Sequence, residues 1–130
     1  MIVLDASAVL DWLLQSPAGR LIETRIYSRN ETLHAPHLLD LEIAQVLRRL
    51  VREGRISDQR ADLALQDLLK AAIVRYPHFV LLRVIWGYRH NFSAYDAAYI
   101  ALAEALGATL ITRDKRLVAA RGHGANIELF

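Results

Sequence analysis

The segment Ile2-Val3-Leu4-Asp5 consists of three apolar residues and a carboxylate, and it leads directly into the helical pattern of residues 6–14. A short, uninterrupted apolar run of this kind is typical of a strand that is covered on both faces of a sheet. A carboxylate at the end of such a strand is costly to bury unless it is paired, hydrogen-bonded or bound to a metal ion. The segment therefore predicts a strand at residues 2–5 followed by a helix, and it makes Asp5 the first candidate site residue.

The same alternation of strands and helices continues along the chain. Apolar runs predict further short strands at residues 32–35, 108–112 and 126–129. Caps and apolar periodicity predict five further helices. One begins at Pro17, one spans 38–53, and one follows the cap Ser57 and includes Ile73. The last two span 94–106 and 115–121. Residues 79–90 are ambiguous, since their beginning is strand-like and the rest is helical. This order predicts one α/β domain over residues 1–130, with a mostly parallel central sheet and helices on both faces.

The composition narrows the class of protein. With 130 residues, of which 54% are hydrophobic, the chain suits one globular domain, and the lack of cysteine excludes disulfides and zinc–thiolate sites. It has no signal-peptide pattern and no apolar stretch long enough to span a membrane, so we expect a cytoplasmic protein without a membrane partner. The net charge of +2 is weak evidence for a nucleic-acid partner. Nearly all basic residues are arginine, which suits phosphate binding, although a genome rich in arginine codons explains this equally well.

Three further acidic residues stand, like Asp5, in apolar surroundings. Glu42 interrupts the apolar repeat of its predicted helix, Asp96 lies in the first turn of a nearly uncharged helix, and Asp114 follows an apolar strand. Ligand sites of open α/β sheets form beyond the carboxyl ends of the strands, where Asp5 and Asp114 both lie. We therefore expect the four carboxylates to meet at one end of the sheet and to share a purpose.

A set of four carboxylates without histidine or cysteine favours a hard divalent cation, Mg²⁺ or Mn²⁺, over zinc. Mg²⁺ is usually held by a few carboxylates together with the phosphates of a substrate. A bound ion lowers the pKa of a water molecule to make a nucleophile, and a second ion, on the order of 4 Å away, can stabilise the leaving oxygen. The pattern therefore predicts metal-dependent hydrolysis of phosphodiester bonds.

Four segments carry a resemblance to a known family. They are IVLDASAVL (2–10), APHLLDLE (35–42), SAYDAAYIALA (93–103) and LITRDKRL (110–117). In order and spacing they resemble the PIN-domain ribonucleases, and most closely the VapC-type toxins of bacterial and archaeal toxin–antitoxin modules. The resemblance covers essentially the whole chain. Each segment alone is weak, but the four in this order are specific.

The resemblance implies a PIN-like three-layer fold and a metal-dependent endoribonuclease, the toxin of a type II toxin–antitoxin system. It implies that Asp5, Glu42, Asp96 and Asp114 form the catalytic set and bind Mg²⁺, or Mn²⁺ in its place. None of these acids is lost from the pattern, so nothing in the sequence suggests an inactive enzyme.

Three supporting residues follow from the same resemblance. Ser7 and Thr112 match hydroxyl positions that support the carboxylates and the catalytic water network. Arg89 matches an arginine that could contact a phosphate. Ser7 is also explained as a hydroxyl in the first turn of a helix, and Thr112 as a β-branched strand residue.

Apolar surface predicts partners beyond the RNA substrate. The paired helices around residues 38–53 and 57–75 carry more apolar surface than a small sheet covers. One use is a homodimer, and another is a groove for a partner peptide. The resemblance implies both, with a cognate VapB-like antitoxin that wraps the toxin and inserts a segment toward the acidic site.

Three other functions compete with this interpretation. A receiver-like signalling domain would need adjacent acids after the first strand, but Asp5 is followed by Ala6 and Ser7. A phosphatase of the haloacid-dehalogenase type needs Asp-x-Asp, where this chain has Asp5-x-Ser7. A PIN-like module that binds RNA or a partner without cutting would be favoured by the loss of one of the four acids, and all four are present.

Overall fold

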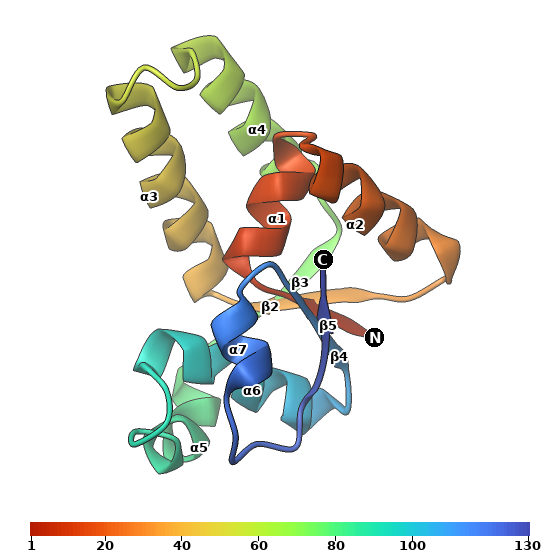
Figure 1. Ribbon diagram of the computed structural model, residues 1–130, viewed down its shortest axis with the longest axis vertical. Coiled ribbons are helices and arrows are strands. Elements are labelled where there is room, and N and C mark those ends of the chain that lie inside the picture. The colour runs from red at the N-terminus through yellow and green to blue at the C-terminus, as the bar shows by residue number, and fades with distance from the viewer.

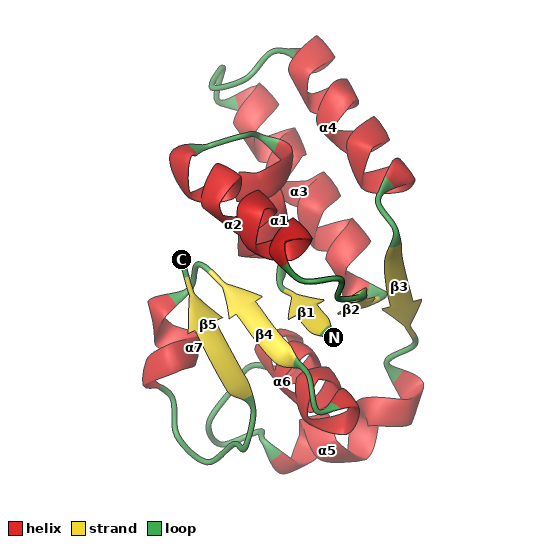
Figure 2. Ribbon diagram, turned by 90° about the vertical axis from the view of Figure 1, so that its right-hand side faces the viewer, coloured by secondary structure: helices red, strands yellow, loops and turns green.

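Five short strands form one sheet in the computed structural model, which describes all residues 1–130. The strands are β1 (Ile2–Leu4), β2 (Leu33–Pro36), β3 (Ile73–Tyr76), β4 (Thr109–Thr112) and β5 (Asn126–Leu129), in the spatial order β3-β2-β1-β4-β5. Every pair of neighbours is parallel, so their carboxyl ends lie at the same edge of the sheet. The sheet is strongly twisted, so that in Figure 2 the arrow of β3, at one end of the strand order, points down while those of β4 and β5 point up. The predicted α/β class is confirmed, and the sheet is wholly rather than mostly parallel.

Helices cover both faces of this sheet (Figure 1). They are α1 (Ala6–Leu13), α2 (Pro17–Ser28), α3 (Leu38–Arg52), α4 (Asp58–Lys70), the 3₁₀ helix η1 (Phe79–Leu81), α5 (Leu82–Gly87), α6 (Ala94–Leu106) and α7 (Lys115–Ala119). The helices α1 to α4 pack with Ile2 and Leu4 in one apolar core, and α5 and α6 pack with Val3 and Leu110 in a second one. The alternating sides of β1 therefore feed two cores, as a strand covered on both faces requires. None of the helices is both long and apolar enough to cross a bilayer.

The close crossing of α1 and α2 depends on Gly19. A Cβ atom at this position would lie 1.9 Å from the carbonyl oxygen of Asp11, so any other residue would force the two helices apart. Ser16 strengthens the crossing, because its hydroxyl accepts a hydrogen bond from the Gly19 amide (3.0 Å) and donates one to the Asp11 carboxylate (2.7 Å). The crossing holds α1 in place, and the first turn of α1 carries part of the site.

Two predictions for the middle of the chain are wrong. The helix that follows Ser57 ends at Lys70, and Ile73 begins β3 instead of continuing that helix. The chain leaves the helix at Ala71, whose backbone is extended. Because this residue is neither glycine nor proline, the sequence carries no marker for the end of the helix. The strand-like start of residues 79–90 is the 3₁₀ helix η1, and only the helical part of that prediction is confirmed.

Candidate active site: an acidic pocket at the carboxyl ends of the strands

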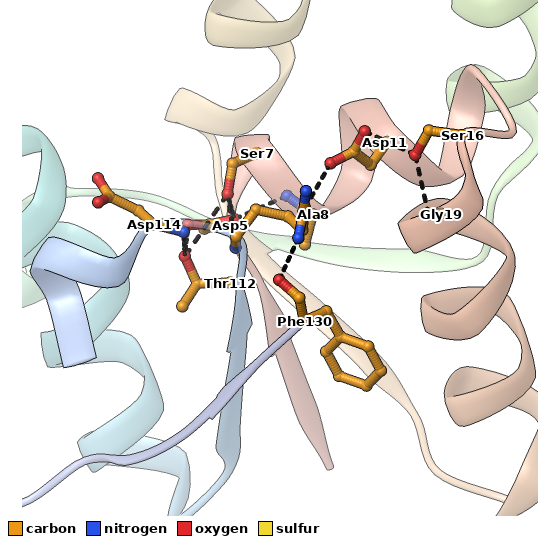
Figure 3. Close-up of polar contacts among 10 residues, drawn as sticks. Asp5, Ser7, Ala8, Asp11, Ser16, Gly19, Thr112, Asp114 and Phe130 are labelled. Atoms are coloured by element: carbon orange, nitrogen blue, oxygen red, sulfur yellow. Dashed lines mark hydrogen bonds and ion pairs between the residues drawn. The ribbon is translucent and has the colours of Figure 1, made fainter.

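Asp5 lines a small pocket and is 5% exposed. It follows β1 and is the N-cap of α1, where its Oδ1 accepts hydrogen bonds from the Ala8 amide (2.9 Å) and the Ser7 hydroxyl (2.7 Å). The Thr112 hydroxyl donates to Oδ2, so both oxygens are held (Figure 3). Three donors from two elements therefore fix the orientation of this carboxylate.

The two hydroxyls also connect Asp5 to the loop between β4 and α7. The Ser7 hydroxyl accepts from the Arg113 amide (2.9 Å), and the Thr112 hydroxyl accepts from the Asp114 amide (2.9 Å). Each hydroxyl thus donates to Asp5 and accepts from the loop that carries Asp114 (Figure 3). This arrangement couples the positions of two acids that lie far apart in the sequence.

Glu42 reaches the same pocket from α3. Its Oε2 accepts a hydrogen bond of 2.5 Å from the hydroxyl of Tyr99, which lies on α6 and is 3% exposed. The sequence interpretation did not include Tyr99. The available signal was spacing, because Tyr99 follows Asp96 by three residues and so shares its helix face.

Asp96 and Asp114 complete the pocket from two helix starts. Asp96 lies in the first turn of α6, and its amide donates to the hydroxyl of the N-cap Ser93 (3.1 Å), which is one of the two hydrogen bonds of a capping box. Asp114 is the N-cap of α7 and accepts from the Arg116 amide (2.9 Å). The pocket has a volume of about 150 Å³ and is lined by Asp5, Ala6, Ser7, Glu42, Asp96, Tyr99 and Asp114.

Burial and mutual repulsion act on the carboxylates of this pocket. Burial raises the pKa of Asp5 above its ordinary value against the lowering effect of its hydrogen bonds, and the charge of Asp114 raises it further. Burial also raises the pKa of Glu42, the charges of Asp5 and Asp96 add to the rise, and the hydrogen bond from Tyr99 opposes it. The pKa of Asp114 is lowered instead, chiefly by its hydrogen bonds from the Arg116 side chain. The inner part of the pocket thus holds like charges with no basic side chain among its lining residues.

The chemistry of this donor set fits a hard divalent cation. Carboxylate oxygens are the ligands that Mg²⁺ and Mn²⁺ prefer, and the four carboxylates are the only charged groups that line the pocket. As the side chains lie, no group of three or more acidic or histidine residues is arranged around one point for a metal ion. In this arrangement Tyr99 binds Glu42 and Arg116 binds Asp114. An ion would have to compete with these contacts.

Arg89 lies outside the pocket. Its side chain is exposed and its Nη1 donates to the carbonyl oxygen of Trp86 (3.0 Å). Its guanidinium stacks over the Trp86 ring at 5.1 Å from the centroid. The structure therefore brings together six of the seven sequence-predicted site residues and leaves Arg89 on the surface.

A second and larger cavity, of about 690 Å³, lies between α1, α2 and α4. Its lining mixes apolar residues such as Trp12 with paired or separate charges such as Glu23 and Arg60. None of the four carboxylates lines it, and its own acids, Glu23, Glu31 and Asp67, share the lining with the basic residues Arg60 and Lys70. Size alone does not make an active site, so the chemistry of the smaller pocket decides the assignment.

Comparison with known proteins agrees with this geometry. The family model described as PIN domain matches residues 2–122. Ribonuclease VapC9 of Mycobacterium tuberculosis is 47% identical over 117 residues, which cover 90% of this chain and 88% of that protein. The solved structure of PAE2754 from Pyrobaculum aerophilum has a TM-score of 0.70 and 26% identity, and covers 97% of this chain and 81% of that one. The structure of M. tuberculosis VapC20, described as a toxin that cleaves the sarcin–ricin loop, has a TM-score of 0.66 at 15% identity, over 92% and 94% of the two chains, and shows likeness of fold alone.

Proposed function

The chain belongs to the PIN-domain family, and we propose that it is a divalent-metal-dependent endoribonuclease that acts as the toxin of a toxin–antitoxin pair. The observation that carries this proposal is the convergence of Asp5, Glu42, Asp96 and Asp114 on one pocket at the carboxyl ends of the strands. The ribonuclease relative at 47% identity over 90% of the chain supports the substrate class. The substrate is RNA, and the bond cleaved is a phosphodiester.

The four carboxylates would hold Mg²⁺, or Mn²⁺ in its place. When bound, the ion supplies an activated water molecule and neutralises charge on the phosphate. The protein's own part is to hold the four carboxylates beside one another in one pocket. Ser7 and Thr112 hold Asp5 by donating to its two oxygens, and Tyr99 holds Glu42 through its hydroxyl. These donors fix Asp5 and Glu42 in the pocket before RNA arrives, whereas an ion would still have to displace Arg116 from Asp114.

A second copy of this chain is the partner we propose for an exposed apolar surface on η1 and α5. Phe79 is 85% exposed and Trp86 is 67% exposed. The exposed apolar residues of this short segment are Phe79, Val80, Leu82, Val84 and Trp86. A run of large apolar side chains in water is typical of an interface. A strict monomer at high concentration in size-exclusion chromatography with light scattering would contradict the homodimer.

A VapB-like antitoxin is the second protein partner that we propose. The exposed apolar residues of α3 and α4, among them Leu41 and Leu69 at 74% each, offer a surface for an apolar segment of another chain. This assignment follows from family membership, since VapC-type toxins work in pairs with an antitoxin. Co-expression with the product of the neighbouring gene, followed by co-purification, tests it.

The proposed activity is tested by incubating labelled total RNA with the purified protein and Mg²⁺ or Mn²⁺, with and without chelator. The key variant is Asp96→Asn, which removes one charge and keeps the shape of the side chain. The matched control is Asp58→Asn, because Asp58 lies in the first turn of α4 as Asp96 does in α6, and it lies outside the pocket. We expect Asp96→Asn to lower the cleavage rate by about 100-fold or more, since removal of one charged group from a preorganised site commonly costs that much.

Discrete fragments that vanish with chelator and with Asp96→Asn, but persist with Asp58→Asn, would support the proposal. Mapping of the fragment ends would identify the target RNA. Equal cleavage by the wild type and a folded Asp96→Asn protein would contradict it and indicate a contaminating nuclease.

A further inference from the structure

One basic side chain is bound to the acidic pocket from its rim. The guanidinium of Arg116 donates from Nε to both carboxylate oxygens of Asp114 (3.0 and 3.1 Å) and from Nη2 to Oδ2 (2.6 Å). The backbone amide of Arg116 donates to Oδ1 as well (2.9 Å). Both oxygens of Asp114 are therefore occupied by groups of a residue only two positions further along the chain.

No other carboxylate of the pocket has a basic partner. Asp5 accepts from hydroxyls and an amide, Glu42 accepts from a phenol, and the ion pairs of the molecule include only Asp114 among the four acids. Arg116 is thus the basic residue that pairs with a carboxylate of this pocket.

We propose that Arg116 is a substrate-binding residue that is held on Asp114 while the pocket lacks a divalent cation and binds an RNA phosphate once the cation takes that carboxylate. The inference rests on the proposed function, because it requires a cation among the four acids. A guanidinium and a metal ion both need the oxygens of Asp114, so they compete for the same electron pairs.

Release of Arg116 from Asp114 costs little free energy, and an RNA phosphate at the pocket would lie within its reach. The Arg116 side chain is 85% exposed, so water replaces the lost contacts, and an exposed ion pair contributes little stability. The planar fork of a guanidinium matches two oxygens of a phosphate as well as it matches a carboxylate. Because α7 fixes the backbone of Arg116 beside Asp114, the freed side chain stays at the rim, where the phosphate must approach the carboxylates.

The first test measures Mn²⁺ affinity of the full chain by titration calorimetry for the wild type, Arg116→Gln and Lys115→Gln. Lys115 is the matched control, because it is exposed and carries the same charge on the same helix, while the side chain that pairs with Asp114 is that of Arg116. Loss of the competing ion pair should tighten Mn²⁺ binding by about three-fold or more in Arg116→Gln, while Lys115→Gln should change it by less than about two-fold. If Mn²⁺ affinity rose equally in both variants, the loss of one positive charge would explain the effect, and the proposed competition between Arg116 and the cation would be contradicted.

The second test measures binding of a labelled RNA oligonucleotide with phosphorothioate linkages, verified to remain uncut, by fluorescence anisotropy. With Mn²⁺ present, Arg116→Gln should weaken RNA binding by about five-fold more than Lys115→Gln, since one charge-assisted phosphate contact is lost. Without Mn²⁺ the two variants should be equal, because Arg116 is then held on Asp114. An equal effect of the two variants in both conditions would overturn the proposal.

The two tests also separate this inference from the proposed function. If the wild type binds no Mn²⁺, the proposed metal-dependent activity fails and the inference fails with it. If the wild type binds Mn²⁺ and cleaves RNA, but Arg116→Gln behaves as Lys115→Gln does, only the role of Arg116 is wrong. Arg116→Lys, which keeps the charge without the fork, should lie between the wild type and Arg116→Gln in RNA binding.

Discussion

Two groups of acidic side chains in this molecule have opposite electrostatic surroundings: one lies among other carboxylates, and the other is paired with an arginine. In the pocket, Asp5 and Glu42 lie near other carboxylates, and burial and like charges raise the pKa of both. Beside α2, Glu31 and Glu128 share Arg25, which donates to Glu31 at 2.6 Å and to Glu128 at 3.0 Å. There the hydrogen bond from Arg25 is the main cause of the lowered pKa of Glu31. The paired group lowers the energy of its charges by ion pairing, whereas the like-charged group keeps a cost that protonation or an added cation can remove.

The two groups should therefore respond to pH in opposite directions. Because the pKa of Glu31 is lowered in the folded protein, its contribution to stability is present above the unfolded pKa and is lost as the pH falls through the folded pKa. Because the pKa of Asp5 is raised, its contribution is present below the unfolded pKa and is lost as the pH rises through the folded pKa. The contrast between pairing and repulsion is thus measurable without any assay of activity.

The largest expected effect on stability comes from Thr112→Val, which tests how the pocket holds its like charges. Thr112 is fully buried, donates to Asp5 and accepts from the Asp114 amide. Valine has the same shape but no hydroxyl, so the Asp5 carboxylate loses a donor and the Asp114 amide loses its acceptor. We therefore expect a loss of about 2 kcal/mol in the free energy of unfolding, measured by urea denaturation. RNA cleavage should fall as well, because Asp5 and Asp114 lose their common link.

The control for this variant lies on the same strand. Thr109→Val removes a hydroxyl that accepts only from Asn126 (3.0 Å) in an exposed contact, and it should cost less than about 0.5 kcal/mol. If the two variants were equally stable, the hydroxyl of Thr112 would be a packing feature of β4 and not a support of the acids.

That the four acids would meet in one pocket was predictable from the sequence, because each one stands in an apolar context that a carboxylate rarely occupies. Apolar context does not identify Tyr99 in the same way, since a tyrosine on an apolar helix is expected in the core. Its hydroxyl contact with Glu42 depends on how α3 and α6 meet. Arg116 is hidden for the opposite reason, because an exposed arginine on a short helix looks like any solvated residue. Side-chain pairs between elements follow from tertiary packing, which local patterns do not encode.

The fold was predictable to the same extent. Strands with strong apolar runs, such as β1 and β4, were found, whereas β3 was assigned to the preceding helix. In β3 only Ile73 is buried, and Val74 is 49% exposed, so its apolar pattern is too short to separate it from a helical repeat. The pairing of β3 with β2 decides its structure, and that contact is not local in sequence.

A smaller effect is expected from the cation itself. Ion binding to the native state at about ten times the dissociation constant should add about 1.4 kcal/mol to the free energy of unfolding, read as a rise in the melting temperature. The rise should be larger near pH 7.5 than near pH 5, since the raised pKa values of Asp5 and Glu42 make protons compete with the ion in acid. An equal rise with Asp96→Asn would mean that the ion binds elsewhere.

The smallest expected effect is that of Arg25→Gln, which converts the paired group into an unpaired one. We expect a loss of about 1 kcal/mol in the free energy of unfolding at neutral pH, because the Arg25 side chain is only 14% exposed and serves two carboxylates. In acid the loss should shrink, since protonation of Glu31 removes the contact in the wild type as well. The control is Arg55→Gln, whose ion pair with Glu53 spans 3.7 Å between exposed side chains and should contribute almost nothing. If Arg25→Gln left stability unchanged at neutral pH while Mg²⁺ still raised the melting temperature, charge pairing beside α2 would be incidental, and electrostatics would matter for this fold only where charges are left unpaired.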